Sequence, residues 1–590
     1  MKNELQNLLH GAIKSLEGHV LTQPVDPAVI SVERARDAQH GDFASNIALR
    51  LAKAAGRNPR DIATAIIAAL PSNTLIVKAE VAGAGFINFH LVKDVFTREI
   101  ARVHELGERY GRAEPAVRRK VLLEFVSANP TGPMHVGHGR QAAFGDALGN
   151  LLAAAGDDVT REYYINDAGR QTEILAVSVW LRYLECCGET LVFPQNGYRG
   201  DYIKPVAQAF FNSHGDQWRH TTTVVFADLP ADAPAGDKDV YIDALIMRCR
   251  QLIGDDNWSL LLQQSIAAML NEIRDDLDGY GVHFDRWTSE REFNESGAIG
   301  RALERLRAAN LLYKKEGAEW FRATQFGDDE DRVVVRDNGV TTYFASDIAY
   351  HLEKRERGFE TLINIFGADH HGYVTRLRGG LQAFGHPGEC LEVLLIQLVA
   401  LYRNGQKLSM GKREANFVTL RQLREEVGND ACRIFYLMRS NDQSLDFDLE
   451  LAKSKSNENP VFYIQYAHAR VASVMKELAA RTLSYDAAAA QQLVTQRGAE
   501  LLAGPQAEAM LSCLTRYPEV IQQAAALRAP HALVHYLKDL ATTLHAFYNA
   551  ERVLVNEDEL RMARVHALLA VQQTLRNGLA ILGATAPDTM

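Results

Sequence analysis

Short apolar runs that alternate with amphipathic segments dominate the middle of the chain. Val121–Phe125 is a nearly all-apolar run, as expected of a strand buried on both faces of a parallel sheet. A loop rich in proline and glycine, residues 127–133, follows it and leads into a helix predicted over His138–Ala155. A second strand is predicted over Val159–Ile165. This order is that of a strand–helix–strand unit.

The same order returns some two hundred residues later. Strands are predicted at Leu362–Phe366 and Val393–Leu401, and a helix between them ends at Gly385. Two such units in one chain predict an α/β fold with a Rossmann-like parallel sheet.

The two ends of the chain follow other patterns. Residues 1–115 mix amphipathic helices with a turn and strand at Val81–Phe89, which predicts an α+β domain. Residues 455–590 repeat apolar positions every three or four residues, which predicts an all-α bundle. The Rossmann-like domain is then 116–454. Within it, 190–330 has mixed character and is predicted to be an insertion.

Composition narrows the class of protein. With 47% hydrophobic and 23% charged residues, the chain is globular rather than disordered or fibrous. Its six cysteines form no CxxC pair, which argues against a zinc ribbon or a disulfide framework. We find neither a signal peptide nor an apolar run of membrane-spanning length, so we expect a cytoplasmic protein without a membrane partner. A net charge of −10 still allows a local basic groove that binds nucleic acid.

The first candidate site follows the strand at Val121–Phe125. His135 and His138 stand three residues apart in the first turn of the next helix, where both imidazoles can donate hydrogen bonds to phosphate. Gly137 leaves room for a flat base against the backbone. Two surface histidines that cap a helix would give the same pattern. The buried strand, the proline/glycine loop and the helix around them favour a nucleotide site.

A second candidate site follows the strand at Val393–Leu401. The run Lys407-Leu-Ser-Met-Gly-Lys412-Arg413 carries lysines on a glycine-containing loop. From such a loop an ammonium can reach an α-phosphate as charge builds during nucleotidyl transfer. By itself this run is better interpreted as a solvated basic turn.

Together the two segments resemble the class I aminoacyl-tRNA synthetases, whose His-x-Gly-His and Lys-Met-Ser-Lys-Ser loops bind ATP. Leu123 to His138 is similar to the extended first motif of arginyl-tRNA synthetases, and His40 to Asn46 is similar to part of their additional N-terminal domain. Further segments match other blocks of that family: 343–350, 367–373, 416–420, 428–433 and 583–590. The resemblance implies that the substrates are L-arginine, tRNA(Arg) and ATP with Mg²⁺, and that the C-terminal bundle binds the anticodon.

The loop that corresponds to Lys-Met-Ser-Lys departs from the family pattern. It aligns best as Ser409–Lys412, so the first lysine and the serine are missing. Lys412 is therefore the first candidate for a catalytic phosphate contact, beside His135 and His138, and Lys407 is the second. The predicted ATP contacts are Pro133, Met134, Gly137, His138, Asp369, His370, Met410 and Lys412.

Recognition of arginine can be argued from the shape of its side chain. A guanidinium is a planar fork of donors that a buried carboxylate answers with two hydrogen bonds, and such a site rejects lysine. The resemblance selects Asp347, at the start of a helix after a strand predicted at Val340–Phe344, with Tyr343 against the guanidinium plane. Glu124 is a strand acid that would be costly to bury without a partner, so we expect it to face the same pocket. The other predicted arginine contacts are Ser127, Asn129 and His370.

The predicted reaction needs positioning and charge stabilisation more than proton transfer. The carboxylate of arginine attacks the α-phosphate of ATP in line, releasing pyrophosphate, and the arginyl group then passes to tRNA. The resemblance implies transfer to the terminal 2′-hydroxyl and adenylate formation only with tRNA bound. We expect no structural metal and a monomer, although the sequence itself does not determine the oligomeric state.

Contacts to tRNA are predicted at both ends of the chain. Splayed anticodon bases stack on aromatic side chains, and each candidate aromatic could equally belong to the helical core. The candidates are Asn46 in the N-terminal domain and Tyr463, Tyr466, Arg470 and Phe547 in the bundle.

Three other functions fit parts of the sequence. A glutamyl- or glutaminyl-type synthetase shares the fold and the loops, but its pocket needs no acid for a guanidinium. A small adenylyltransferase with His-x-Gly-His has no use for the long helical C-terminal domain. A non-catalytic tRNA-binding relative should have lost His135, His138 or the loop lysine, and all are present.

Overall fold

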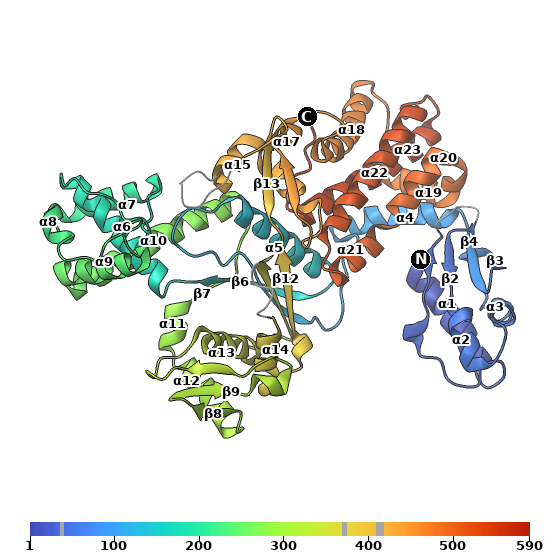
Figure 1. Cartoon of the computed structure of the whole chain (residues 1–590). Helices are drawn as coiled ribbons and strands as arrows, with labels where there is room; N and C mark the ends of the chain where they lie inside the picture. The colour runs from blue at the N-terminus through green and yellow to red at the C-terminus, as the bar shows by residue number, and fades with distance from the viewer. Residues whose placement is uncertain (36–39, 369–373, 409–417) are drawn as a thin grey trace. The chain divides into compact units, whose positions relative to one another are not determined.

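The computed structural model describes residues 1–35, 40–368, 374–408 and 418–590. The chain forms two compact units, each of which combines segments that are distant in sequence (Figure 1). The first unit consists of Met1–Gly107, Glu477–Thr515 and Ala546–Ala570. The second consists of Glu108–Lys476, Arg516–His545 and Val571–Met590.

A five-stranded parallel sheet forms the centre of the second unit. Its strands are β5 (Lys120–Glu124), β6 (Asp158–Ile165), β7 (Arg286–Ser289), β11 (Thr361–Gly367) and β12 (Leu391–Ile396). They lie in the order β12-β11-β5-β6-β7, so the chain runs outward from β5 on one side and from β11 on the other. The predicted Rossmann-like parallel sheet is confirmed. Ligands bind such sheets where the strand order reverses, here between the carboxyl ends of β5 and β11.

Helices cross over between the strands of this sheet. They include α5 (Val136–Ala154), α6 (Arg170–Cys186), α13 (Tyr343–Glu356) and α14 (Val374–Ala383). Nearly all of α5 is buried, because small residues let it approach β5 closely. A Cβ on Gly145 would lie 2.2 Å from the ring of Phe125. A larger residue at Gly145 would therefore push α5 away from the end of β5.

Two crossovers of the sheet carry large inserts. Between β6 and β7 lie η4 (Asp201–Ile203), α7 (Lys204–His214), α8 (Thr222–Val225), α9 (Lys238–Ile253) and α10 (Asp255–Gly279). These pack with α6 around a core of their own that contains Trp180, Trp218 and Trp258. Between β7 and α13 lie α11 (Glu290–Glu295), α12 (Ala298–Ala308), β8 (Leu312–Lys315), β9 (Ala318–Phe321), η5 (Ala323–Phe326) and β10 (Arg332–Val335). The interval 190–330 is thus interrupted by β7, a strand of the core sheet that the sequence did not reveal.

Two predicted strands are wrong. The apolar run Val393–Leu401 is divided between β12 and β13 (Val399–Arg403), which belong to different sheets and are separated by Gln397 and Leu398. The segment Val340–Phe344 does not form a strand. Thr342 caps α13 by accepting a hydrogen bond from the backbone of Ala345 (3.4 Å), so the helix begins at Tyr343.

A smaller sheet with short helices follows the parallel sheet in the chain. β13 lies between β14 (Gln406–Lys407) and β15 (Leu445–Asp448). The accompanying helices are α15 (Leu420–Val427), α16 (Asn429–Leu437) and α17 (Leu449–Lys453), whereas η7 (Gly388–Cys390) lies earlier, directly before β12.

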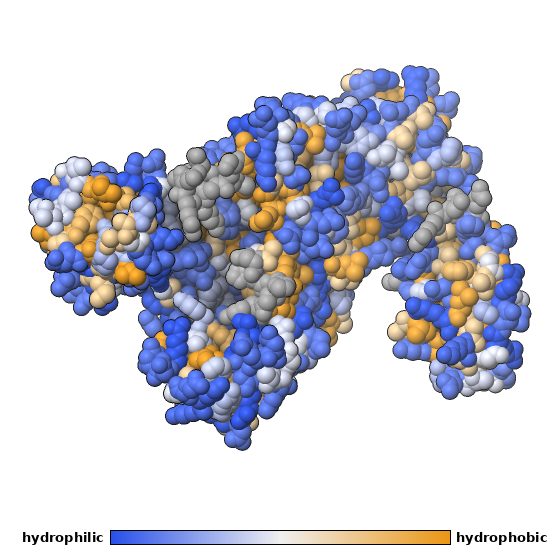
Figure 2. Space-filling view, in the orientation of Figure 1, coloured by the Kyte–Doolittle hydropathy of each residue, from blue (hydrophilic) through white to orange (hydrophobic). Residues whose placement is uncertain are grey.

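The C-terminal part is helical, as predicted. Its helices are α18 (Pro460–Ala480), α19 (Ala487–Leu501), α20 (Pro505–Leu514), α21 (Tyr517–Ala526), α22 (Pro530–Ala550) and α23 (Asp558–Ile581). No helix in the described part of the chain is long and apolar enough to span a membrane. The face of the molecule in Figure 2 is largely hydrophilic, with scattered apolar side chains.

The N-terminal residues form an α+β arrangement, as predicted. The helices are α1 (Lys2–Leu16), η1 (Pro27–Val29), α2 (Ile47–Ala55), α3 (Pro59–Ala68), α4 (Asp94–Leu106) and η3 (Gly107–Arg109). The strands β1 (Glu33–Arg34), β2 (Phe43–Ser45), β3 (Ile76–Ala82) and β4 (Phe86–Leu91) form an antiparallel sheet. The predicted turn and strand at 81–89 is the second half of the β3–β4 hairpin.

Candidate active site

A cavity of about 1440 Å³ opens where the strand order reverses. The residues that follow β5 and β11 line it, together with the start of α5, one face of α13 and the turn between β12 and β13. Its lining includes three residues from the first predicted motif and two from α13: Glu124, His135, His138, Tyr343 and Asp347. Segments far apart in sequence therefore meet in one cavity, at the position where this fold type binds ligands.

The chain leaves β5 in a strained conformation. Val126 and Ser127 both have positive φ, 66° and 40°, which costs energy for residues with a Cβ and most of all for a β-branched one. The bend places the Ser127 hydroxyl where it accepts a hydrogen bond from the backbone of Tyr164 (3.1 Å) and donates one to Glu124 (3.3 Å). Strain of this kind is typical of ligand sites, where the surrounding structure holds it in place.

The two histidines of the first motif hold each other at the start of α5. His135 is the N-cap, and its Nδ1 accepts hydrogen bonds from the backbone N–H groups of Gly137 (3.1 Å) and His138 (3.4 Å). The Nδ1 of His138 accepts in turn from the backbone N–H of His135 (3.3 Å), and the rings stack with centroids 3.7 Å apart. Because both Nδ1 atoms accept, each neutral ring carries its proton on Nε2. Both histidines thus lie beside the positive end of a helix, which suits phosphate, although Nε2 of His135 is itself buried.

Gly137 serves the histidine pair directly. A Cβ at this position would lie 3.0 Å from Cε1 of His135. The glycine therefore lets the imidazole fold over the first turn of the helix, in addition to any room it leaves for a base.

Buried hydrogen bonds fix the first motif to later parts of the chain. The backbone of Leu420 donates to the carbonyl of Met134 (2.8 Å), so the start of α15 lies beside the first motif. Arg140, only 1% exposed, donates to the carbonyls of Gln397 (2.8 Å), Gln443 (2.8 Å) and Ser440 (2.9 Å). Burial lowers the pKa of Arg140 to about 10. No pattern in the sequence indicates that this arginine ties α5 to the turn after β12.

The opposite end of the cavity is acidic. Asp347 lies in the second turn of α13, half-buried, and Tyr343 lies one turn earlier with its side chain mostly exposed. Glu290, at the start of α11, also lines the cavity. Burial, together with the negative charges of Asp167 and Asp347, raises the pKa of Glu290 from its usual 4.5 to about 7. A cation in this part of the cavity would relieve that repulsion.

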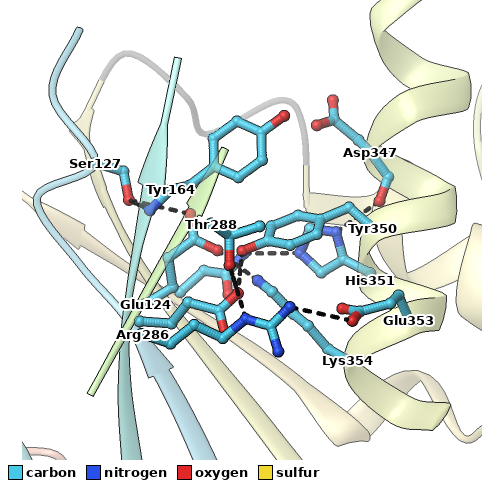
Figure 3. Close-up of polar contacts among 12 residues, drawn as sticks. Glu124, Ser127, Tyr164, Arg286, Thr288, Asp347, Tyr350, His351, Glu353 and Lys354 are labelled. Atoms are coloured by element: carbon cyan, nitrogen blue, oxygen red, sulfur yellow. Dashed lines mark hydrogen bonds and ion pairs between the residues drawn. The ribbon is translucent and has the colours of Figure 1, made fainter. Parts of the chain in front are cut away.

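Beneath the acidic end lies a buried network, shown in Figure 3. Glu124, on β5, forms an ion pair with Lys354 of α13, and the lysine is completely buried. Its ammonium also lies 4.2 Å from the ring centroid of Tyr350. Sequence analysis expected Glu124 to need a ligand because a buried acid requires a partner. The protein itself supplies that partner, although Glu124 still lines the cavity.

Comparison with known proteins decides the family. The family model of the arginyl tRNA synthetase N terminal domain matches residues 3–91, that of the class I (R) tRNA synthetase catalytic domain matches 102–186, and that of the DALR anticodon binding domain matches 464–590. The arginine–tRNA ligases of Thioalkalivibrio sulfidiphilus (strain HL-EbGR7) and Legionella pneumophila (strain Corby) are each 50% identical to the chain over 592 residues and cover it completely, as it covers them. The chain belongs to the arginyl-tRNA synthetase family.

Solved structures agree with this assignment. A Campylobacter jejuni structure is 30% identical, with a TM-score of 0.71, and covers 85% of this chain and all of its own. The arginyl-tRNA synthetase of Thermus thermophilus has a TM-score of 0.74 over the whole of both chains. At 23% identity that second likeness shows the fold.

Several residues that the family resemblance singled out lie outside the described residues. These are Asp369, His370, Met410 and Lys412. Lys407 is described, exposed on β14. The described residues on either side of 409–417 form backbone contacts with other segments. Leu408 donates a backbone hydrogen bond to Leu401 (2.9 Å), and Thr419 forms an isolated β-bridge with His135.

The remaining predicted arginine and ATP contacts from the first motif are described. Asn129 is exposed and donates to the side chain of Gln171 (2.6 Å), which also lines the cavity. Met134 is 1% exposed, and Pro133 precedes it at intermediate exposure. Neither residue is among those that line the cavity.

The predicted tRNA contacts have different surroundings. Tyr466 stacks on Phe462, and Arg470 lies 4.9 Å over the Tyr466 ring and donates to His545 (2.9 Å). The ring centroids of Tyr463 and His545 lie 4.7 Å apart. All of these except His545 are partly exposed, so α18 presents an aromatic and basic cluster.

The other two predicted tRNA contacts are less accessible. Phe547 is 1% exposed, so its ring belongs to the core and cannot stack on a base in this conformation. Asn46 is half-buried and accepts a hydrogen bond from Ser31 (2.8 Å).

Sequence reasoning missed several residues that surround the predicted site residues. Glu290, Arg140 and Lys354 were not predicted. Only Lys354 left a signal, because it lies seven residues after Asp347 and therefore on the same face of the helix. No group of three or more histidine, cysteine, aspartate or glutamate side chains suited to a metal ion occurs among the described residues.

Proposed function

We propose that the chain activates L-arginine with ATP and transfers it to the 3′-terminal adenosine of tRNA(Arg), releasing AMP and pyrophosphate. The observation that carries this proposal is the polarity of one cavity. Its α5 end offers N–H donors to phosphate, and its α13 end offers carboxylates to a cation. A carboxylic acid with a cationic side chain, placed between them, would direct its carboxylate towards the nucleotide.

Asp347 and Glu290 are the proposed guanidinium partners. Burial and the charges of Asp167 and Asp347 raise the pKa of Glu290, so a cation bound beside this carboxyl would favour its ionised form. A guanidinium can bind both carboxylates through its fork of donors, and the Tyr343 ring lies one turn away on α13. A neutral side chain would leave the acids repelling each other, and lysine would satisfy fewer of their lone pairs.

Glu124, Ser127 and Asn129 are proposed to hold the amino-acid end of arginine. The charge of Glu124 is already balanced by Lys354, so its carboxylate suits a hydrogen bond to the α-amino group better than a second guanidinium contact. Ser127 and Asn129 follow on the same strained loop. With arginine bound in this way, its carboxylate would point towards His135 and His138.

The histidine pair is proposed to bind the ATP phosphates. Their Nε2–H groups and the end of α5 stabilise the negative charge that develops on the α-phosphate, and Lys412 or Lys407 adds a positive charge from the later loop. Pro133, Met134, Gly137 and Met410 would complete the nucleotide contacts, with Asp369 and His370 from the loop after β11. Mg²⁺ would arrive on the ATP phosphates, because imidazoles dominate this end of the cavity and magnesium prefers oxygen ligands.

We propose that three domains, 1–115, 116–454 and 455–590, have different functions. The central part performs the chemistry, transferring arginine to the 2′-hydroxyl, and Asn46 in the first part contacts tRNA. Tyr463, Tyr466 and Arg470 form the proposed anticodon-binding cluster, since bases stack on aromatic and guanidinium planes. We also propose that the chain acts as a monomer in the cytoplasm, where its six free cysteines would stay reduced.

Aminoacylation of total tRNA with each of the twenty labelled amino acids tests the reaction. We expect arginine alone to be charged, and Asp347→Asn to lower kcat/KM for arginine about a hundredfold while leaving the KM for ATP within about twofold. Charging of glutamate or glutamine instead would contradict the assignment of Asp347 and Glu290.

Pyrophosphate exchange tests the order of events. We expect exchange in the presence of arginine and tRNA and none when tRNA is omitted. A chain that binds tRNA but neither exchanges pyrophosphate nor charges any amino acid would be a binding protein, and the proposal would then be wrong.

A further inference from the structure

A row of polar residues crosses the parallel sheet beneath the acidic end of the cavity. Asn364 on β11, Glu124 on β5, Glu162 on β6 and Arg286 on β7 are register partners from strand to strand. Side chains at one register position point to the same face of a parallel sheet. These four residues, the polar row, therefore face α13 together, in a sheet whose strands are otherwise rich in apolar residues.

Helix α13 and its C-cap provide a polar partner for each residue of the polar row. The side chain of Asn364 donates to Nε2 of His351 (2.8 Å), Lys354 pairs with Glu124, and Tyr350 and Arg357 both donate to Glu162. At the edge of the sheet, Nη2 of Arg286 lies 3.6 Å from Oε1 of Glu353. Every strand from β11 to β7 thus has a polar partner on one helix and its C-cap (Figure 3).

The contacts beneath the cavity are buried and electrically balanced. Lys354 and Glu162 have no exposed side-chain surface, and Glu124 is 6% exposed. Burial raises the pKa of Glu162, but the hydrogen bonds from Arg357 and Tyr350 and the charge of Lys354 outweigh it, so the carboxyl stays ionised. Each buried carboxylate therefore has its own cation.

His351 connects this interface to the ligand group itself. Burial and the charge of Lys354 lower the pKa of His351 to about 3, so the ring is neutral. Its Nε2 accepts from Asn364, so the proton is on Nδ1, which donates to the backbone carbonyl of Asp347 (2.8 Å). The sheet thereby holds the main chain of Asp347 through a single side chain.

Stability alone does not explain such an interface. Well-packed apolar residues of similar volume usually stabilise a buried interface as well as ion pairs do, because two charges must first be removed from water. Apolar contacts, however, let a helix slide or rotate slightly, whereas each ion pair fits one height and one rotation. Asp347 and Tyr343 share the helix face that carries His351 and Lys354.

We propose that Lys354, Tyr350 and His351 are positioning residues that set the height and rotation of α13 and so place Asp347 and Tyr343 for the guanidinium. This inference rests on the proposed function, since it assigns these residues to recognition of arginine. All three lie at the α13 end of the cavity: Lys354 is fully buried outside the cavity lining, whereas Tyr350 and His351 contribute to that lining beside Asp347. Their loss should therefore weaken arginine binding specifically and leave the nucleotide end, built on α5, unchanged.

The test compares KM values for arginine and ATP in aminoacylation by the full chain. Lys354→Met keeps the length of the side chain and removes its charge, and we expect the KM for arginine to rise about tenfold while the KM for ATP stays within about twofold. Lys354→Arg should recover most of the loss. Tyr350→Phe removes only a hydroxyl that donates to Glu162 and should raise the KM for arginine about threefold.

Tyr183→Phe is the matched control. Tyr183 is a fully buried tyrosine in the core of the first insert, and its hydroxyl donates to Gly215 (2.7 Å). We expect it to lower the melting temperature about as much as Tyr350→Phe and to leave both KM values unchanged. An unchanged KM for arginine in Lys354→Met, or equal rises for arginine and ATP, would overturn the inference.

Two further outcomes are decisive. If Lys354→Met does not fold, Tyr350→Phe decides, and a KM for arginine equal to that of the wild type would refute the positioning role. If the wild-type chain charges no arginine, the proposed function fails first. Normal charging with unaffected variants would contradict this inference alone.

Discussion

Two helices on the same sheet present the two ends of the cavity, and they are held in different ways. Helix α5 is buried along nearly its whole length by small and apolar residues, and its histidines are fixed by hydrogen bonds to backbone groups two or three residues away. Helix α13 meets the sheet through side-chain ion pairs and hydrogen bonds. Lys354 and Glu124, for example, are 230 residues apart in sequence.

This difference predicts which substitutions each end of the cavity tolerates. A local cap keeps its geometry as long as the helix exists, because its donors and acceptors belong to one turn. A group positioned by distant charges depends on several segments at once, and loss of one partner leaves a buried charge behind. The phosphate end should therefore resist distant changes and be sensitive to close packing, and the arginine end should show the reverse.

The largest effect is expected at the histidine pair. His138→Ala removes one phosphate donor and should lower kcat/KM about 10²–10³-fold. His135→Asn should show a comparable loss with a nearly unchanged melting temperature, because asparagine still accepts the helix-capping hydrogen bonds. Pyrophosphate exchange and thermal unfolding together measure both. A loss of less than about tenfold in either variant would refute the assignment of phosphate binding to the pair.

Close packing of α5 is tested at Gly145. Gly145→Ala places a Cβ 2.2 Å from the buried ring of Phe125 and should lower the free energy of unfolding by about 3 kcal/mol, although alanine favours helices. At Gly300, on the exposed face of α12, an added Cβ would meet no atom within 4 Å. Gly300→Ala should therefore raise stability by up to about 1 kcal/mol in the same urea titration. Equal effects would mean that packing does not position α5.

The acidic end should respond to pH through Glu290. Its folded-state pKa of about 7 lies above the ordinary 4.5, so its contribution to stability is complete below about pH 4.5 and is lost as the pH rises through 7. Glu290→Gln should therefore stabilise the ligand-free chain at pH 8 by on the order of 2 kcal/mol and change little at pH 4.5. Thermal unfolding at the two pH values measures the difference.

Arginine binding should show the opposite trend. A guanidinium favours ionised Glu290, so arginine affinity should rise about tenfold between pH 6 and 8 in the wild-type chain and stay nearly flat in Glu290→Gln. A rise of the same size in both proteins would assign the pH dependence to another group.

The smallest effect is expected on the outer face of α13. Arg305 and Glu356 form an ion pair (2.5 Å) in which both side chains are about half exposed. Glu356→Gln should cost no more than about 0.5 kcal/mol and leave the KM for arginine unchanged. If this variant weakened arginine binding as much as Lys354→Met, the burial of the charges would not be what positions the helix.

The sequence predicted β5 and β11 well because both are short apolar runs next to glycine or proline. The cap of α5 and the helical C-terminal part followed from equally local signals. The strand predicted at Val340–Phe344 failed because its β-branched and aromatic residues favour a strand, whereas the Thr342 side chain caps a helix there. β7 was missed because four residues, Arg286–Ser289, are too few to show a period.

The site was predicted in part for a similar reason. His135, His138, Glu124 and Asp347 belong to short motifs, and all four line the cavity. The partners that set their charge and orientation mostly come from other segments, and the spacing of Lys354 from Asp347 marks only their common helix face. No spacing rule links Lys354 to Glu124, because only the register of the sheet and the turn of α13 bring them together.

The separation of Glu124 from Lys354 also has a consequence in time. A ribosome adds roughly 5–20 residues per second, so β5 leaves it roughly 12–46 s before the lysine that neutralises Glu124. During this interval the first insert, with its own hydrophobic core, can already fold. Until α13 has been synthesised, the Glu124 carboxylate of β5 has no lysine partner and stays in water.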